Sequence, residues 1–350
     1  MRHIIIGAGA VGGAIGGRLA ESGSEVLLVA RGAHYEALRD HGLRLVTPQG
    51  TRTHRLPVAE GPEAVELRAD DVLVLTVKTQ DSIAALDAWA PREVAGTGGA
   101  TAGEVLPLVC AQNGVESERL ALRRFSRVYG MCVWLPAHFL EPGVVVADCA
   151  PLTGLLHIGR YPSGLDETAR SIAGALEKAP FEAPVVPDVM RWKYAKLLAN
   201  LGNALRAVCG TSGGDARAEL LERAVAEGRA AFAAAGIEAV SDEEQREARG
   251  HKVDPQPLEG HPRGGGSSWQ SLSRGTGTIE TDYLNGEIVL IGRAHGVPTP
   301  VNAVLQRVAD EFARDRRPAS SLPFGELAAR VGGPVPQAVI ARGSAARDSS

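Results

Sequence analysis

The chain begins with a short apolar run that leads directly into a glycine-rich turn. Residues 2–6 (RHIII) have the composition of a buried strand, and they are followed by GAGAVG and then by a helical pattern. In such a unit the first glycine permits a tight turn, the second lets backbone N–H groups approach a pyrophosphate, and the third allows close helix–strand packing. The helix N-terminus then faces the phosphates. This pattern predicts a dinucleotide site formed by Gly7, Ala8, Gly9, Ala10, Val11 and Gly12.

The end of the second predicted strand indicates which dinucleotide binds. Residues 25–30 follow at the distance expected for a βαβ unit, and the position after such a strand commonly holds a carboxylate that contacts the free 2′-hydroxyl of NAD. This chain has Arg31 there instead. Because a guanidinium pairs with phosphate through two hydrogen bonds, Arg31 favours the 2′-phosphate of NADP(H). The alternative is that Arg31 is a solvated loop residue.

The overall composition is that of an ordinary globular protein. Of the 350 residues, 44% are hydrophobic and 22% are charged, which suffices for two domains with buried cores. The formal net charge is −4 and no basic cluster is present, which argues against nucleic-acid binding. The sequence shows neither a signal peptide nor a membrane span, so we expect a cytoplasmic protein with no membrane partner.

Cysteine and histidine spacing argues against a metal site. The four cysteines are scattered with no C-x-x-C pair, and the nine histidines form no H-x-x-x-H or H-E-x-x-H arrangement. We therefore expect reduced core cysteines and no bound metal.

Strand-like runs alternate with helical or loop segments through the first half of the chain. This rhythm is typical of an α/β fold with a doubly wound, Rossmann-type sheet. A hairpin is expected from residues 43–47 and 53–58, and a second strand pair from residues 144–147 and 155–160. The runs predicted for the main sheet lie at residues 2–6, 25–30, 72–77, 106–111 and 128–134.

The second half changes to long helical patterns, with Asp166, Asp188 and Asp215 as expected N-caps. Residues 241–266 are polar and rich in proline and glycine, which predicts a loop or a flexible lid. We expect a Rossmann-type domain over residues 1–180, a mostly α-helical catalytic domain over residues 181–318 and a flexible tail over residues 319–350. The predicted helices lie at residues 167–179, 189–208, 216–235, 275–295 and 301–314.

Polar side chains recur along the helix predicted from residue 189. Lys193, Lys196, Asn200 and Asn203 are spaced by three, four and three positions, which places them on one helix face. A solvated stripe is the ordinary alternative. Two asparagines inside a helix are nevertheless poor helix formers, and they favour directed hydrogen bonds.

A second polar cluster contains Ser268 and, twelve residues later, Glu280. Taken by themselves, the serine is an ordinary cap or turn residue and the carboxylate an ordinary surface acid. A functional role for this cluster is indicated only when it is considered together with the other motifs.

Taken together, these residues resemble the ketopantoate reductases, NADPH-dependent 2-keto acid reductases of the 6-phosphogluconate-dehydrogenase-like superfamily. The resemblance covers residues 1 to about 314 and includes the glycine-rich turn, the ARG sequence at residues 30–32, TVK at 76–78 and QNG at 112–114. In the second half, Lys196 and Asn200 match the family's catalytic lysine and the asparagine one turn later. Ser268 and Glu280 match its substrate-binding serine and its acid.

The resemblance implies a division of labour among these residues. Lys196 would donate the proton, and Glu280 would assist by holding a substrate hydroxyl or by positioning Lys196. Because a lysine with an ordinary pKa holds its proton tightly at neutral pH, partial burial in an interdomain cleft is expected to lower the pKa of Lys196. Substrate contacts are implied for Asn113, Asn200, Asn203 and Ser268. Cofactor contacts are implied for the glycine-rich turn, Arg31, Lys78, Asn113 and Glu280.

One departure from the family pattern leaves the substrate open. The family usually has a second asparagine eight residues after its lysine, whereas this chain has Ala204 there and Asn203 one place earlier, about 100° around an ideal helix. The first interpretation is reduction of ketopantoate to (R)-pantoate. The alternatives are a reductase of another keto acid or ketone, and a non-catalytic NADP(H)-binding regulator. An exposed apolar strip on the second-domain helices would support a homodimer.

Overall fold

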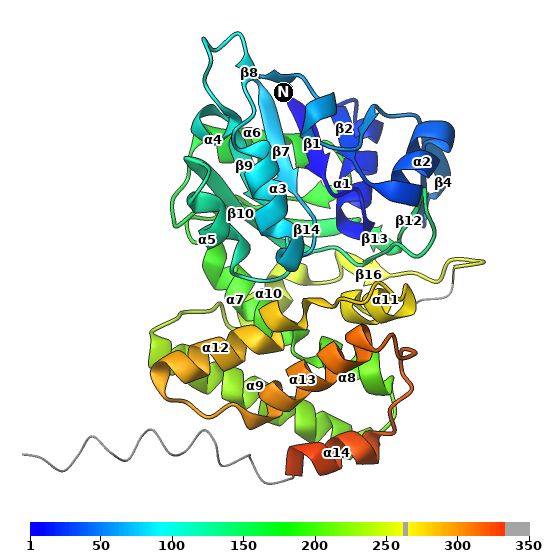
Figure 1. Ribbon diagram of the computed structural model, residues 1–350, viewed down its shortest axis with the longest axis vertical. Helices are drawn as coiled ribbons and strands as arrows, with labels where there is room; N and C mark the ends of the chain where they lie inside the picture. The colour runs from blue at the N-terminus through cyan, green and yellow to red at the C-terminus, as the bar shows by residue number, and fades with distance from the viewer. Residues whose placement is uncertain (262–264, 333–350) are drawn as a thin grey trace, which may run out of the picture.

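The buried strands of the first half assemble into one large sheet in the computed structural model, which describes residues 1–261 and 265–332 (Figure 1). The strand order is β15-β14-β10-β9-β7-β1-β2-β5. The strands from β5 to β10 run parallel, whereas β14 is antiparallel to β10. The bounds are β1 (Arg2–Ile6), β2 (Glu25–Val29), β5 (Val58–Ala59), β7 (Asp71–Leu75), β9 (Pro107–Cys110), β10 (Arg127–Trp134), β14 (Gly154–Arg160) and β15 (Phe181–Glu182). The predicted Rossmann-type fold is confirmed, and β15 lies just beyond the domain boundary predicted at residue 180.

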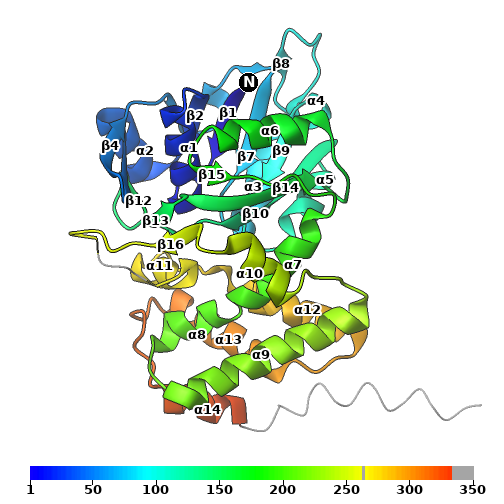
Figure 2. The same cartoon turned by 180° about the vertical axis from the view of Figure 1, so that it is seen from behind.

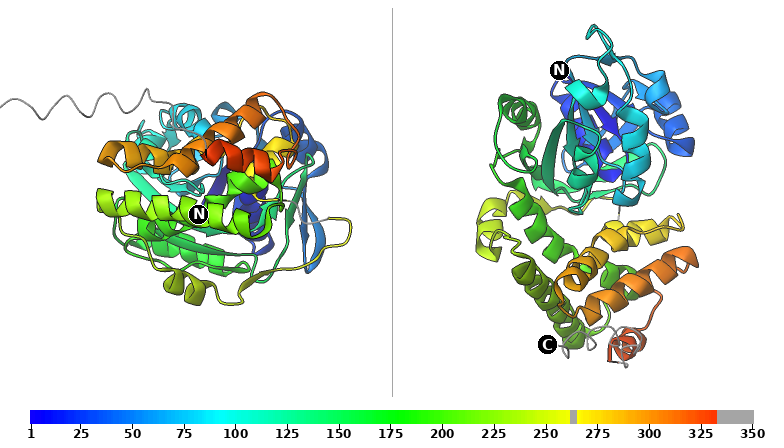
Figure 3. Two further views of the ribbon diagram at one scale, coloured as in Figure 1. Left: turned by 90° about the horizontal axis from the view of Figure 1, so that it is seen from below. Right: turned by 60° about the vertical axis from the view of Figure 1, so that its left-hand side comes forward.

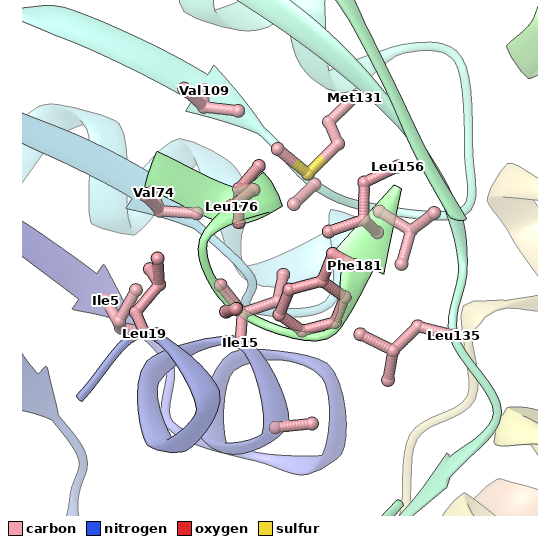
Figure 4. Close-up of a cluster of buried hydrophobic side chains, with 14 of the residues drawn as sticks. Ile5, Ile15, Leu19, Val74, Val109, Met131, Leu135, Leu156, Leu176 and Phe181 are labelled. Carbon is pink, nitrogen blue, oxygen red and sulfur yellow. The ribbon is translucent and has the colours of Figure 1, made fainter. Parts of the chain in front are cut away.

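Helices cover both faces of this sheet, which explains why its strands are apolar along their whole length. Ile5 of β1 packs with α1 (Ala10–Glu21) and α6 (Glu167–Glu177), as Figure 4 shows. Its neighbours Ile4 and Ile6 point to the opposite face, toward α3 (Ser82–Trp89) and α5 (Ser117–Leu122). The N-terminus of α1 is thereby held at the carboxyl end of β1, where a Rossmann-type fold binds its ligand.

A small second sheet packs on the other side of α1. It has the order β11-β12-β3-β4, and the close approach depends on Gly13, whose Cβ would lie 2.7 Å from Val145. The predicted hairpin is confirmed as the pair β3 and β4. The second predicted pair is wrong, because β12 pairs with β3 and β11 while β14, buried on both faces, joins β10 in the large sheet. The bounds are β3 (Leu43–Thr47), β4 (Gly50–His54), β11 (Ala137–His138) and β12 (Val144–Ala147).

The remaining elements of the sheet domain are short and connect these strands. Strands β6 and β8 pair in parallel, and β13 pairs with β16 from the second half of the chain. Their bounds are β6 (Leu67–Arg68), β8 (Val94–Ala95), β13 (Cys149–Pro151), β16 (Val253–Pro255), α2 (Gly32–His41), α4 (Ala102–Val105), η1 (Pro62–Ala64) and η2 (Thr79–Asp81).

The second half is helical, as predicted, and it lies beneath the sheet domain in Figures 1 and 2. The right-hand view of Figure 3 shows the same two lobes from another side, with α7 leading from one into the other. The predicted helix 189–208 is broken at Leu201, and the one predicted for residues 275–295 is a short η3 followed by α12. The bounds are α7 (Val189–Asn200), α8 (Gly202–Cys209), α9 (Gly214–Ala235), α11 (Ser267–Ser273), η3 (Glu280–Tyr283), α12 (Asn285–His295) and α13 (Pro300–Arg314).

The three predicted N-caps behave differently. The carboxylate of Asp166 accepts a hydrogen bond from the backbone N of Ala169 at 2.9 Å and caps α6. Asp188 occupies the N-cap position of α7 without a side-chain capping bond, and Asp215 lies inside the first turn of α9. Only Asp166 therefore caps as predicted.

The loop prediction for residues 241–266 is partly wrong. Its first third is the helix α10 (Asp242–Arg249), which starts with a capping box: the Glu244 N–H donates to the Ser241 hydroxyl and the Ser241 N–H donates to the Glu244 carboxylate. A serine followed three residues later by glutamate is the sequence signal of this start. Residues 262–264 lie outside the described residues.

The prediction of a flexible tail from residue 319 is wrong for residues 319–332. Backbone hydrogen bonds join Ser320 and Leu322 to the end of α8, and α14 (Phe324–Gly332) packs on α13 with Leu327 fully buried. The reason is the apolar face that this short helix presents to the helical core. Residues 333–350 lie outside the described residues.

Candidate functional site

A cavity of about 700 Å³ lies between the sheet domain and the helical domain. The sheet domain contributes the glycine-rich turn, the residue after β2, Lys78 after β7 and Asn113 after β9. The helical domain contributes residues from α7, α8, α11 and η3. Since the carboxyl ends of parallel strands are the usual ligand-binding edge of such a sheet, this cavity is the candidate functional site.

Each of the three glycines of the turn meets a different structural requirement, as the sequence indicates. Gly7 has φ of +102°, and a Cβ there would lie 2.8 Å from the backbone N of Val77. Gly12 sits against β1 and β7, since its Cβ would meet the Gly7 carbonyl at 2.3 Å. Among the described residues, a Cβ on Gly9 would find only Phe139 within 4 Å, so the turn faces the cavity at this point. Gly7 to Val11 line the cavity, whereas Gly12 lies behind it as a packing residue.

Arg31 follows β2 and faces the cavity with an exposed side chain. Asp81 lines the same cavity, although no motif in the sequence singles it out. Burial is the main cause that raises the pKa of Asp81, and the Glu280 carboxylate adds to it while Arg31 opposes it. An anionic group bound beside Arg31 therefore meets a guanidinium, with the Asp81 side chain in the same cavity wall.

Lys196 is almost fully buried, with 8% of its surface exposed, and lines the cavity from α7. Its Nζ lies 5.1 Å from the centre of the Trp134 ring. Burial lowers the pKa of Lys196 to about 8, which agrees with the direction expected from the sequence. The nearby Lys193 cation lowers it further, whereas Cys132 and the Glu280 carboxylate raise it. A lysine with this pKa holds a proton at neutral pH and releases it readily.

Asn200 and Asn203 also face the cavity, and the break at Leu201 brings them together. The Nδ2 of Asn203 donates to the Oδ1 of Asn200 at 3.3 Å. The Nδ2 of Asn200 is buried without a hydrogen-bond partner in the described chain, so it is available to a ligand. Ala204 is buried in the helical core, and the missing family asparagine at that position therefore removes no group from this cavity.

Lys193 does not belong to the cavity, which corrects the prediction of a single polar face. Its ammonium group pairs with the Glu118 carboxylate of α5, and both side chains are buried between the domains. Burial raises the pKa of Glu118, and the Lys193 charge counteracts this. The helix face turned toward the sheet domain thus holds a structural ion pair one turn before Lys196.

Glu280 joins the two domains through hydrogen bonds to the chain after β7. Its Oε1 accepts from the backbone N and the Oγ1 of Thr79 at 2.9 and 2.8 Å, and its Oε2 accepts from the Nζ of Lys78 at 3.3 Å. No hydrogen bond between Glu280 and Lys196 occurs in the described part of the chain. Glu280 therefore holds η3, and the cavity wall that it forms, on the sheet domain. Thr79 is a partner that the sequence did not reveal.

The two serines at the start of α11 lie in different environments, and the one that was predicted, Ser268, is not the one that lines the cavity. Ser267 lines the cavity, whereas Ser268 is 1% exposed and is not one of the lining residues. Both hydroxyl oxygens are buried without a hydrogen-bond partner in the residues described. The sequence also missed Trp134, Phe139, Arg206 and Arg274, which line the cavity. No motif distinguishes these four residues from ordinary surface or core side chains.

Among the described residues, no group of three or more histidine, cysteine, aspartate or glutamate side chains lies close enough to hold a metal ion. In the same residues, no helix is long and apolar enough to cross a membrane.

A Rossmann-type domain, a helical domain and a cleft that holds a buried lysine together define a two-domain dehydrogenase. The family model for the ketopantoate reductase PanE/ApbA matches residues 3–162, and the model for its C-terminal region matches residues 188–313. The chain belongs to the ketopantoate reductase family of oxidoreductases.

Two similar proteins support this membership. The 2-dehydropantoate 2-reductase of Halobacterium salinarum is 31% identical over 327 residues, which span 90% of this chain and 100% of the relative. The 2-dehydropantoate 2-reductase of Pyrococcus horikoshii is 28% identical over 324 residues, covering 87% of this chain and 95% of the relative.

Solved structures share the fold. A PanE/ApbA family ketopantoate reductase from Ralstonia eutropha has a TM-score of 0.73 at 28% identity, covering 91% of this chain and 100% of that one. D-mandelate dehydrogenase, solved with NADH and anilino(oxo)acetate, has a TM-score of 0.73 at 21% identity with the same coverage. A dimeric ketopantoate reductase from Staphylococcus aureus has a TM-score of 0.64 at 20% identity, covering 90% and 100%. The last two likenesses show the fold alone.

Proposed function

We propose that this protein reduces a 2-keto acid with NADPH, and that the substrate is 2-dehydropantoate, which is reduced to (R)-pantoate. The observation that carries the proposal is the buried Lys196 ammonium group in the cleft, with its pKa lowered to about 8. The names of the relatives support the choice of substrate.

NADP(H) fits the sheet-domain side of the cleft. Gly7 to Val11 would hold the pyrophosphate on the N-terminus of α1, and Arg31 would pair with the 2′-phosphate. Lys78 and Asn113 line the cavity between these residues and Lys196, where they would contact the rest of the cofactor. The open space in front of Gly9 supports this placement, because a side chain there would project into the cavity.

When bound, NADPH supplies a hydride to the carbonyl carbon of the substrate. Lys196 gives its proton to the carbonyl oxygen as negative charge develops there, and it is then reprotonated from solvent. Asn200 offers its unpartnered Nδ2 to the substrate, while Asn203 orients Asn200 through the hydrogen bond between their amides. Ser267 supplies a hydroxyl group that lines the cavity and has no partner in the described chain, and Glu280 holds η3, which contributes to the cavity wall, on the sheet domain.

A second candidate substrate class has one specific observation in its favour. The ring of Trp134 lies beside the Nζ of Lys196, so a substrate whose carbonyl contacts Lys196 places its side chain near an aromatic surface. Keto acids with a bulky apolar side chain would pack on this ring. A non-catalytic regulator is disfavoured, because cofactor binding alone does not require a buried lysine in the cleft.

The test is NADPH oxidation by the purified protein with 2-dehydropantoate and a panel of other 2-keto acids, with NADH as the control cofactor. Turnover of 2-dehydropantoate with a kcat/KM of about 10⁴ M⁻¹s⁻¹ or more is expected, and Lys196→Ala should abolish it while NADPH still binds. Arg31→Ala should weaken NADPH much more than NADH. Turnover of only aromatic keto acids would favour the second candidate, and binding without any turnover would favour the regulator.

The proposal also extends to the assembly of this chain. The dimer stated for the Staphylococcus aureus relative supports a homodimer for this chain as well, which sedimentation analysis would test. The cytoplasmic location predicted from the sequence stays a prediction.

A further inference from the structure

Arg274 is a half-buried cation that the helical domain presents to the cleft. It follows α11 directly and lines the cavity. Its Nε is buried and has no hydrogen-bond partner in the described chain. No carboxylate within those residues forms an ion pair with Arg274, whereas Lys78 is paired with Glu280 and Lys193 with Glu118. A half-buried guanidinium without a paired anion is unfavourable, so the position indicates a ligand that supplies the charge.

The surroundings of Arg274 show where that ligand lies. The guanidinium carbon lies 5.0 Å from the centre of the Phe139 ring, which follows β11 in the sheet domain. The same ring lies 4.3 Å from the ring of His34, and one of its atoms lies 3.9 Å from a Cβ placed on Gly9. Arg274 therefore reaches across the domain boundary to Phe139, whose ring lies beside the glycine-rich turn.

His34 is a second residue that relates Arg274 to the glycine-rich turn. Its Nε2 lies 2.7 Å from the carbonyl oxygen of Ala8 in the turn, and the Arg274 charge is one cause of its lowered pKa, after burial. Contacts between Arg274, Phe139 and His34 thus form a continuous series beside the turn, in which the two rings are tilted by 51° and the Arg274 cation lies over the Phe139 ring.

We propose that Arg274, from the helical domain, binds the pyrophosphate of the dinucleotide opposite the N-terminus of α1. The inference rests on the proposed function only for the presence of a dinucleotide in the cleft, not for the identity of the keto acid. The pyrophosphate would then be held between the helix N-terminus of one domain and a guanidinium of the other. Cofactor binding would consequently join the two domains at a second point, in addition to the Glu280 contact with Thr79.

The test compares ligands that contain the pyrophosphate with one that does not. NADPH, 2′-phospho-ADP-ribose and adenosine 2′-monophosphate are titrated against wild type and Arg274→Gln, with NADPH fluorescence as the signal and the other two as competitors. A lost hydrogen-bonded charge contact should weaken NADPH and 2′-phospho-ADP-ribose by roughly 10- to 100-fold. Binding of adenosine 2′-monophosphate should stay within about twofold, since it lacks the pyrophosphate.

Arg317→Gln is the matched control, because Arg317 is also half-buried and stacks on a phenylalanine, 3.9 Å from the ring centre of Phe312, but it does not line the cavity. This control should bind all three ligands like wild type. Arg274→Lys should recover part of the affinity, which a merely structural role would not require. Thermal unfolding of each variant checks that it is folded.

Three results would overturn the assignment: unchanged binding of 2′-phospho-ADP-ribose by Arg274→Gln, equal weakening of adenosine 2′-monophosphate, or a raised KM for the keto acid with cofactor affinity intact. The last result would make Arg274 a ligand of the substrate carboxylate. Failure of the proposed function has a different signature, because wild type would bind 2′-phospho-ADP-ribose in an Arg274-dependent way and yet reduce none of the keto acids.

Discussion

Replacing Lys196 with methionine should have two opposite effects. Methionine keeps an unbranched apolar stem in the cavity wall but removes the ammonium group, so reduction of the keto acid should fall by several orders of magnitude. The folded protein, however, should become more stable at neutral pH. The reason is that the cleft lowers the pKa of Lys196, which means that folding works against the charged form.

The size and the pH range of this effect follow from the pKa values. The pKa falls from 10.5 to about 8 on folding, and at about 1.4 kcal/mol for each pH unit the charged lysine costs at most roughly 3 kcal/mol. Below about pH 8 both the folded and the unfolded chain carry the proton, so the whole cost is present. Between about pH 8 and 10.5 the folded protein releases the proton first, and the cost disappears.

The assay is urea-induced unfolding of wild type and Lys196→Met, followed by circular dichroism at about pH 7 and about pH 10. We expect a gain of up to roughly 3 kcal/mol near pH 7 that shrinks strongly near pH 10. The exposed Lys178 serves as a control, since Lys178→Met should change the unfolding free energy by about 0.5 kcal/mol or less at either pH. In parallel, the wild-type kcat/KM for reduction should decline above about pH 8.

Two results would refute this reasoning. The first is a Lys196→Met variant that is less stable than wild type near pH 7. The second is a stability difference that does not change between neutral and alkaline pH. Either would mean that the lysine charge is well compensated inside the folded protein, and that burial is not what prepares Lys196 for proton transfer.

Further predictions concern packing and hydrogen bonding around the cleft. Lys193→Met should lower the free energy of unfolding in chemical denaturation by about 3–5 kcal/mol, because it leaves the buried Glu118 carboxylate without its partner. Adding Glu118→Met should recover most of that loss. Gly12→Ala should abolish NADPH binding or folding, as measured by fluorescence and circular dichroism, since the new methyl group would lie 2.3 Å from a backbone oxygen. Asn203→Ala should raise the KM for the keto acid without loss of stability, whereas Ala204→Asn should lower the melting temperature by placing an amide in the apolar core.

Local patterns in the sequence were sufficient for most of the sheet domain. The strand at residues 2–6 and the glycine-rich turn after it are fixed by residues next to each other, so the reasons given for Gly7 and Gly12 agree with the observed φ and packing. The depressed pKa of Lys196 was also expected, because the resemblance placed this lysine in an interdomain cleft. The helix α10 was missed although its capping box is visible in the sequence, since proline and glycine nearby outweighed it.

Other features depended on which strands become neighbours. The segments 144–147 and 155–160 were expected to pair with each other, yet each finds a better partner in a different sheet, and nothing local distinguishes these choices. The even spacing of Lys193 and Lys196 predicted one polar face. The tertiary structure separates them, because Lys193 meets Glu118 of α5 whereas Lys196 meets the cavity.

The sequence by itself determined the strand, glycine-rich turn and helix at the start of the chain and the α/β class of the first domain, because each is encoded by neighbouring residues with a fixed period or spacing. The family resemblance singled out Lys196 as the candidate catalytic residue. Only the tertiary structure decided that Glu280 binds Thr79, that Lys193 pairs with Glu118 away from the cavity, and that Arg274 lies over the ring of Phe139. The physical reason is that these contacts join segments far apart in the chain, and burial and hydrogen bonding select them only after both domains have packed.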